Sequence, residues 1–332
     1  MPLKVTWKKG MRLSTDVFNA MDASLDENIR LSNLIATGGN LGLIHTDKPF
    51  ELSVNVSNTI LEIISLSCRG VTKSGRIVDI DFDSAYSDTF DTRITLPSSN
   101  GDEAFLLIVR FHDKQWREVN EMFSEPLYTF AVIGENSPID RDSLPIGRIV
   151  NQYGWRLDET EFVPPCLFTG AHPRFEEQVI RAKSIMKAIS DKCLKAQDCV
   201  ARNLIGSIWQ SAADNYILID KSSNSLSPGR LFGSLQQVIA SFVIGCSNEK
   251  YVSLEHADPF VAYYQKTLDE RNLYRDIQEG LKLCDEISIK MDAVCAMNER
   301  IDVPSVPGNK KKDKEQTTEE SGRRSRRFII EV

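Results

Sequence analysis

The sequence predicts an α+β protein in which an N-terminal β-sandwich is followed by an antiparallel helical bundle. Apolar and polar residues mostly alternate over residues 46–171, which is typical of half-buried strands. From residue 172 the apolar residues recur every three or four positions, which is typical of amphipathic helices. Pro164 and Pro165 separate the two patterns. Because proline cannot donate to a sheet and pushes the preceding residue out of the helical region, the pair indicates the exit from the β region.

These patterns divide the chain into four regions. An N-terminal arm and helix cover residues 1–45, a β-sandwich 46–171, a four-helix bundle 172–303 and a basic flexible tail 304–332. The 332 residues are enough for two domains of ordinary size, each with its own core.

Composition narrows the class of protein. A hydrophobic content of 41% and a charged content of 26% are typical of soluble globular proteins, and the net charge of −7 argues against a nucleic-acid binder. No apolar run is long enough to span a bilayer, and residues 1–10 lack the apolar core of a secretory signal. The seven cysteines include no C-x-x-C pair and are expected to be buried, reduced thiols. We therefore expect a cytoplasmic protein.

A first helix is predicted over residues 16–35, where apolar residues recur at a spacing near four. The glycine cluster at residues 38–42 lacks the Lys-Ser/Thr of a phosphate-binding loop and does not lie between a strand and a helix, so it is expected to be a structural turn. Upstream, Trp7 is either a packing anchor or an interface anchor, and both interpretations stay open.

The β region is expected to contain eight strands, because short apolar alternations are separated by turn residues. They cover residues 52–56, 59–68, 76–82, 92–96, 104–111, 127–133, 146–150 and 155–157. Several short strands with few helical stretches favour a sandwich or a small barrel.

Strand alternation places Asp79, Asp81 and Asp83 on one face. Carboxylate oxygens are the ligands that Ca²⁺ prefers, but a calcium-binding loop needs glycine at the sixth position and glutamate at the twelfth, where this chain has Ser84 and Phe90. The pattern favours a solvated strand face, and no metal site is predicted.

The helical region begins with an apolar seam over residues 179–219 that includes Met186, Ile189 and Cys193. Ser227-Pro228 and Asp258-Pro259 each combine an N-cap residue with a proline suited to the first helical position, and so predict the starts of two later helices.

The last helix is expected to continue from residue 258 to residue 301 and to be roughly 60 Å long. Its seam includes Tyr274, Ile277 and Leu281. Seams of this length pack either inside their own bundle or against neighbouring chains, so these residues are candidates for either contact.

The tail, residues 304–332, has eight basic and five acidic residues and little hydrophobicity, which is typical of a disordered segment. It ends, however, with the β-prone apolar residues Phe328, Ile329 and Ile330. Such a tip is either an unstructured end or a strand that adds to the sheet of a partner.

Catalytic chemistry is not indicated. The four histidines are far apart in sequence, and none is paired with a second histidine or a cysteine at a metal-ligand spacing. No nucleophile elbow is present. We expect no enzyme activity, no cofactor and no small-molecule substrate.

Three segments together resemble the TssK family of type VI secretion baseplate subunits. They are V-T-W-K-K-G-M at residues 5–11, the segment 144–175 with its G-W turn and F-V-P-P-C-L motif, and P-G-R-L-F-G-S-L at residues 228–235. The resemblance implies a β-sandwich similar to the shoulder of phage receptor-binding proteins, then a four-helix bundle, assembled as a homotrimer. It also implies contact with TssF/TssG-type wedge proteins through the N-terminal side, where Val5, Trp7, Lys8, Gly10 and Met11 are the candidate wedge residues.

The family usually has a C-terminal head domain that grips the envelope-spanning membrane complex, and this chain has only the basic tail after its bundle. The resemblance therefore implies either that the Phe328–Ile330 tip docks on a membrane-complex protein, or that the system uses a different membrane anchor, which we favour. A related adaptor of a phage tail or tailocin is the alternative function.

Overall fold

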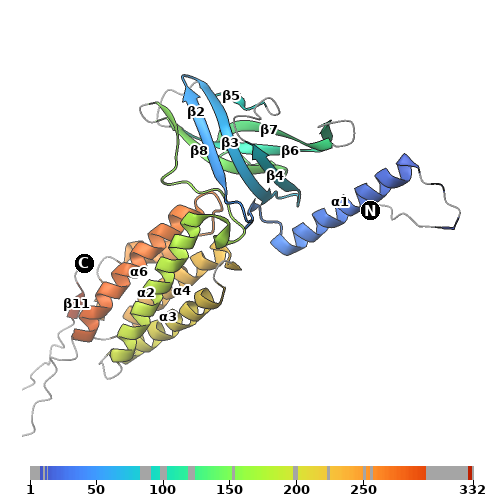
Figure 1. Ribbon diagram of the computed structural model, residues 1–332. Helices are drawn as coiled ribbons and strands as arrows, with labels where there is room; N and C mark the ends of the chain where they lie inside the picture. The colour runs from blue at the N-terminus through green and yellow to red at the C-terminus, as the bar shows by residue number, and fades with distance from the viewer. Residues whose placement is uncertain are drawn as a thin grey trace, which may run out of the picture. The chain divides into compact units, whose positions relative to one another are not determined.

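A computed structural model of the chain describes residues 8–9, 12, 14–82, 91–97, 103–118, 124–151, 154–196, 201–222, 225–249, 252–254, 257–296 and 328–330. The chain forms two compact units. Unit 1 comprises Met1–Glu177, Ser223–Gly229 and Asp269–Arg275, and unit 2 comprises Gln178–Ser222, Arg230–Leu268 and Asp276–Val332. Antiparallel sheets dominate unit 1 and helices dominate unit 2, which confirms the predicted α+β class (Figure 1).

The first sheet of unit 1 is organised around the twelve-residue strand β3 (Ile60–Val71). The strands β2 (Glu51–Ser57) and β1 (Gly42–Leu43) pair with successive parts of one edge of β3. The strands β4 (Ile77–Phe82) and β5 (Arg93–Thr95) pair with the other edge. The β3 residues that pair with β4 also pair with β1 or β2, so β4 must lie on the opposite side of β3 from both. All of these pairs are antiparallel, as is usual for a sheet built from short connections.

The second sheet has the order β7-β6-β8-β9. Its strands are β6 (Ala104–Glu118), β7 (Ser124–Gly134), β8 (Ser143–Asn151) and β9 (Trp155–Leu157). The sheet is buried on both faces, because consecutive residues of β6 from Leu106 to Val109 point alternately to opposite faces and are all at most 1% exposed.

The two sheets pack face to face as a sandwich. Phe82 and Phe130 have ring centroids 6.2 Å apart, and the Tyr128 hydroxyl accepts a hydrogen bond from the amide of Asp79 at 3.3 Å. The opposite face of the second sheet is covered by Phe162, which packs on Leu106 and Ile108. The loop after β9 therefore closes the core that the first sheet leaves open.

The first helix, α1 (Thr15–Thr37), confirms the helix predicted over residues 16–35. It ends at Gly38, whose φ of 63° is left-handed, a conformation that glycine adopts without a steric penalty. Arg30 and Asn33 donate to the carbonyls of Ser74 and Gly75 in the turn between β3 and β4. A side chain at Gly75 would lie 2.5 Å from the Arg30 carbonyl, so the turn must be glycine for α1 to approach it.

Unit 2 is a helical bundle in which four long helices lie side by side (Figure 1). These are α2 (Pro173–Lys195), α3 (Arg202–Ser222), α4 (Pro228–Asn248) and α6 (Leu273–Ala296), and α4 begins at Pro228, as expected from sequence. Helix α3 runs antiparallel to its neighbours, since Lys183 pairs with Asp220 while Glu249 at the end of α4 accepts from the amides of Asn203 and Leu204. The carboxylate of Glu249 thereby supplies partners for the amides at the start of α3.

The prediction of one helix from residue 258 to 301 is wrong. The segment forms α5 (Asp258–Tyr264) and α6, separated by residues 265–272. The side-chain amide of Gln236 in α4 donates to the carbonyls of Tyr263, Tyr264 and Lys266. These carbonyls at the end of α5 thereby gain hydrogen-bond partners outside the helix, and the helix stops there. Helix α6 runs in the same direction as α2. Arg181 pairs with Asp285, and further along both helices Lys192 pairs with Asp292.

Two short strands complete unit 2. The strand β10 (Val252–Leu254) lies between α4 and α5, and it pairs in parallel with β11 (Phe328–Ile330) near the end of the sequence. Among the helices of the described ranges, none combines the length and the apolarity needed to cross a bilayer.

Candidate functional site

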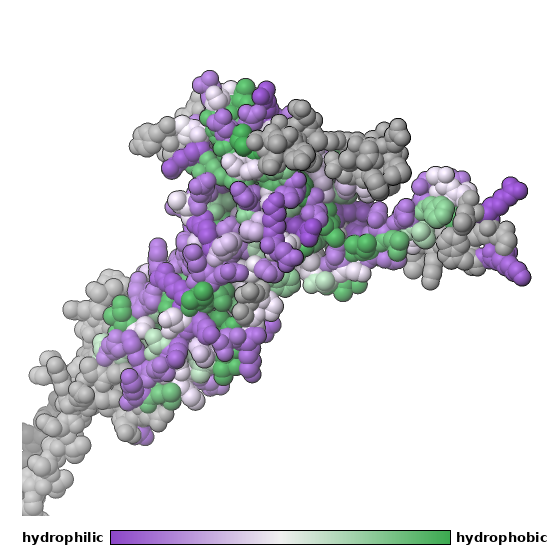
Figure 2. Space-filling view, viewed as in Figure 1, coloured by the Kyte–Doolittle hydropathy of each residue, from purple (hydrophilic) through white to green (hydrophobic). Residues whose placement is uncertain are grey.

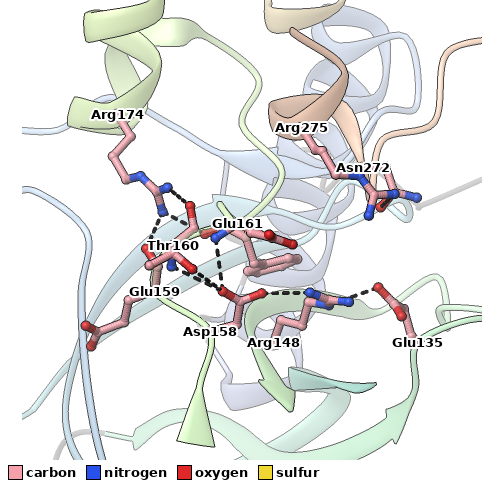
Figure 3. A network of polar contacts seen from close by, with 10 residues as sticks. Glu135, Arg148, Asp158, Glu159, Thr160, Glu161, Arg174, Asn272 and Arg275 are labelled. Carbon is pink, nitrogen blue, oxygen red and sulfur yellow. Dashed lines mark hydrogen bonds and ion pairs between the residues drawn. The ribbon is translucent and has the colours of Figure 1, made fainter. Parts of the chain in front are cut away.

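The segment from β8 to the first turn of α2 holds a network of polar contacts in unit 1 (Figure 3). Arg148 of β8 lies between two carboxylates: its Nε is 2.9 Å from Glu135 Oε1, and its Nη1 donates to Asp158 Oδ2 at 2.7 Å. The side chains of Arg148 and Asp158 are 17% and 7% exposed. A hydrogen-bonded ion pair this deeply placed is strongly coupled, because little water screens it.

The same contacts shift the pKa values of both partners. Burial lowers the pKa of Arg148, but the hydrogen bonds to Asp158 and Glu135 outweigh burial and raise the pKa above its usual value. Burial raises the pKa of Asp158, but the amide of Glu161, the guanidinium of Arg148 and Thr160 outweigh it, so the pKa lies below its usual value. Both groups are therefore charged near neutral pH.

Asp158 also shapes the loop that follows β9. Its Oδ1 accepts from the amides of Thr160 and Glu161 at 3.2 and 3.0 Å and from the Thr160 hydroxyl at 3.1 Å. In this Asx-type turn the aspartate side chain accepts hydrogen bonds from backbone amides that no longer belong to the sheet, which explains why an aspartate follows the strand. The turn brings Phe162 back over the second sheet.

Arg174, in the first turn of α2, holds the loop from the other side. Its Nη1 donates to the carbonyls of Glu159 and Phe162 at 2.5 and 3.1 Å, and its Nη2 donates to that of Thr160. The same guanidinium lies over the ring of Tyr274, 4.5 Å from the centroid. The loop is thus fixed to the first turns of both α2 and α6.

The charged groups of this network hold the loop after β9 in position. A hollow of about 150 Å³ beside it is lined by Glu103, Ala104, Arg148, Val150, Arg156, Asp158, Thr160 and Glu161. A general acid or base works best with a pKa near the operating pH, and the pairing of Arg148 with Asp158 moves both pKa values away from it. We interpret the network as a structural clamp on the β-to-helix junction.

His172 precedes α2 and acts as its N-cap. Its backbone is extended, with φ −147° and ψ 130°, and its Nδ1 accepts from the amide of Arg174 at 3.2 Å. This role requires the neutral imidazole. Burial, with the nearby charge of Arg174, lowers the pKa of His172 to about 4.

Acidification should therefore weaken the fold through His172. Its folded-state pKa is below the unfolded value of about 6.5, so between those values the unfolded chain binds more protons and stability rises with pH. Between pH 7.5 and 4.5 we expect wild type to lose about 2 kcal/mol more than His172→Asn, which can cap but does not titrate there. Urea unfolding across this pH range measures the difference, and parallel pH profiles for the two proteins would contradict the N-cap assignment.

The other candidate ligands occupy ordinary structural positions. His45 Nδ1 is 2.6 Å from the Gly170 carbonyl, and His112 Nε2 is 2.8 Å from Thr129 Oγ1. Asp79 pairs with Arg69 and Asp81 with Lys48, while Asp83 lies outside the described residues. Within the ranges that the structure covers, no three His, Cys, Asp or Glu side chains gather as metal ligands would.

The predicted seam residues lie inside the chain. Met186, Ile189, Cys193, Tyr274, Ile277 and Leu281 are each at most 5% exposed. These six side chains therefore pack within one chain, and their role in contacts between copies stays a prediction. The strand Phe328–Ile330 pairs with β10 of its own chain, and its docking on a membrane-side partner stays a prediction.

The predicted wedge residues Val5, Trp7, Gly10 and Met11 lie outside the described residues, and Lys8 is exposed. The adjoining helix α1 has no buried residue. Five of its apolar side chains are exposed to solvent: Phe18, Leu25, Ile29, Leu31 and Ile35 are 41–83% exposed. Figure 2 shows apolar surface along this helix. Apolar side chains that recur at helical spacing and stay exposed are typical of an interaction surface.

Sequence reasoning missed the Arg148 network, although it identified the segment that contains it. One local signal was available, since Asp158-Glu159-Thr160 after a strand is an Asx-turn pattern. The partners Glu135 and Arg174 come from positions 13 and 26 residues away from Arg148 in the sequence, and no local rule pairs them.

The chain is similar to known proteins in its structure. No family model matches the sequence, and no curated protein matches it. A crystal structure of TssK matches with a TM-score of 0.56 at 14% identity, over 87% of this chain and 69% of that one. TssK from the type VI secretion system of EAEC, in complex with nanobody nb18, matches with a TM-score of 0.54 at 11% identity, over 81% and 68%.

A third structure, the TssK-TssF-TssG baseplate subcomplex of a type VI secretion system, matches with a TM-score of 0.55 at 12% identity, over 86% of this chain and 99% of the matched chain. The protein is thus an α+β protein of two units, a sandwich of antiparallel sheets and a helical bundle. Its fold is similar to that of TssK across most of its length.

Proposed function

We propose that this protein is a structural baseplate subunit of a type VI secretion, or contractile injection, system and not an enzyme. The supporting observation is that one chain combines a two-sheet unit and a helical bundle as TssK does, over 81–87% of its length. The clamp around Arg148 fits this role, because its charged groups are committed to holding a junction.

The subunit would act as a cytoplasmic homotrimer that links wedge proteins of the TssF/TssG type to a membrane-anchoring complex. One of the similar structures contains TssK together with TssF and TssG. Contact with the wedge is assigned to the N-terminal side, namely Val5, Trp7, Lys8, Gly10 and Met11 together with α1. The exposed apolar side chains of α1 support this assignment, because association would bury them.

The test is affinity capture from the native host, with mass spectrometry, using four baits. They are the full chain, a chain lacking Met1–Met11, a Leu25→Asp/Ile29→Asp chain, and Ile244→Asp as control. Leu25 and Ile29 are 52% and 49% exposed, and Ile244 in α4 is 54% exposed. The aspartate substitutions at these three residues should therefore alter the melting temperature by no more than a few degrees.

We expect the full chain and Ile244→Asp to capture wedge and sheath proteins, and both N-terminal variants to capture at least tenfold less, since charges would be buried in the interface. Light scattering should give the mass of three chains for all four baits. Capture by every bait would retain the baseplate function and refute the α1 contact. Recovery of phage-tail proteins instead would favour the tail-adaptor alternative, and recovery of no contractile-tail protein by any bait would refute the proposal.

A further inference from the structure

A strand near the end of the sequence pairs with an earlier strand of the same chain. Val252, Ser253 and Leu254 of β10 pair in parallel with Phe328, Ile329 and Ile330 of β11. No other strand of the described ranges joins this two-stranded sheet. The contact is made by backbone groups, so it is the kind that any extended segment of suitable sequence can form.

This ladder is too small to be permanent. It has three residue pairs, parallel pairing is slightly weaker per residue than antiparallel pairing, and isolated two-stranded ladders are marginal in water. We therefore expect it to open and close while the bundle stays folded, as low-stability segments do.

The connection to β11 gives the strand a long reach. Helix α6 ends at Ala296 and β11 begins at Phe328, and the number of residues between them would allow a span of up to about 100 Å in a fully extended chain. The connection starts in the same unit as β10, where Lys290 in the last turns of α6 has its Nζ 5.9 Å from the centroid of Phe260, six residues after β10. A connection of this length would let the strand leave the edge and return to it at a high effective concentration.

We propose that β10 is a strand-acceptor edge and that the C-terminal residues Phe328–Ile330 are a releasable latch that occupies this edge in the free protein. The occupant is the chain's own apolar C-terminal segment, bound by β-addition. An uncovered strand edge is a template for unwanted pairing, so a tethered latch also protects the free protein. This inference does not depend on the proposed baseplate function.

Hydrogen exchange on the full chain tests occupancy of the edge. Ile329→Pro removes a backbone donor from the ladder and should release the latch, whereas Gln316→Pro changes the tether but not the paired strand. We expect amides of residues 252–254 to exchange roughly tenfold faster in Ile329→Pro than in wild type, and at the wild-type rate in Gln316→Pro. Equal exchange in wild type and Ile329→Pro would overturn the proposal.

A peptide added in trans tests the acceptor. The probe is a fluorescent decapeptide with the sequence of residues 323–332, and the control peptide has the same composition in scrambled order. We expect the probe to bind the Ile329→Pro chain roughly tenfold more tightly than wild type, whose own tail competes, and the scrambled peptide to bind neither. Equal binding of the probe to both chains, or of both peptides to either chain, would refute a specific edge held by the tail.

Dilution separates the chain's own tail from that of a second copy. Protection of residues 252–254 that persists when the protein is diluted to monomers supports pairing within one chain. Loss of protection on dilution would show that the strand comes from another copy and would overturn the latch as stated.

Discussion

Gly280→Ala should destabilise the protein by about 2–4 kcal/mol, although alanine is the better helix former. Gly280 lies in α6 beneath Tyr263, and an added Cβ would be 2.5 Å from Tyr263 Cζ and closer still to its hydroxyl oxygen. The ring has little freedom to move, since Tyr263 is 1% exposed and its hydroxyl donates to the Asp276 carbonyl at 2.9 Å. Overpacking would therefore displace α5 or α6.

Gly233→Ala is the matched control. Gly233 lies in α4, is exposed, and has nothing within 4 Å of the position of its Cβ. The same substitution there should stabilise the protein by about 0.5–1 kcal/mol, because it lowers the conformational entropy of the unfolded chain without a clash. Chemical denaturation of the two variants should thus give changes of opposite sign. A stabilising or neutral Gly280→Ala would contradict the packing of α5 on α6.

The parts of the fold that follow from sequence are those encoded by local periodicity. The alternation in residues 76–82 predicted a strand with one buried face, and in β4 the side chains of Val78, Ile80 and Phe82 are buried while their neighbours are exposed. The spacing near four in residues 16–35 predicted α1 to within two residues at each end. Such patterns are sufficient because each element has one apolar face.

The end of α5 could not be predicted, because its cause is tertiary. The apolar seam continues past residue 264. The helix stops because Gln236 donates to carbonyls at its end, which lie 27, 28 and 30 residues further along the chain. A glutamine in the middle of an amphipathic pattern gives no local sign of this role. The same limit applies to Arg148, whose partners depend on how the loop after β9 folds back.

Arg148→Met should lower the stability of unit 1 by about 2–4 kcal/mol. Methionine fills similar volume but leaves Asp158, 7% exposed, without its cationic partner, and an unpaired charge in such a place is costly. Arg69→Met is the control, since Arg69 makes an equally short ion pair with Asp79 at 2.6 Å but both side chains are about half exposed. Surface pairs of this kind contribute at most about 1 kcal/mol.

The pH dependence separates this charge effect from lost packing. The pKa of Asp158 is lowered in the folded protein, so its contribution to stability is present above the unfolded value of about 3.9 and is lost as pH falls through the folded value. The deficit of Arg148→Met should accordingly be largest near neutral pH and shrink below about pH 4, where a protonated Asp158 needs no partner. Urea unfolding at pH 7 and pH 3 measures it, and a deficit that does not change with pH would assign the loss to packing.

A double-mutant cycle tests whether the two residues act together. Asp158→Asn keeps an oxygen acceptor for the amides of Thr160 and Glu161 but removes the charge that Arg148 needs. If Arg148 and Asp158 form one coupled unit, the double variant should lose at least 1 kcal/mol less than the sum of the single variants. Additive losses would mean that Arg148 acts through Glu135 alone. A measured coupling would instead show that this ion pair contributes to the clamp on the loop after β9, because it joins Arg148 in β8 to the turn that follows β9.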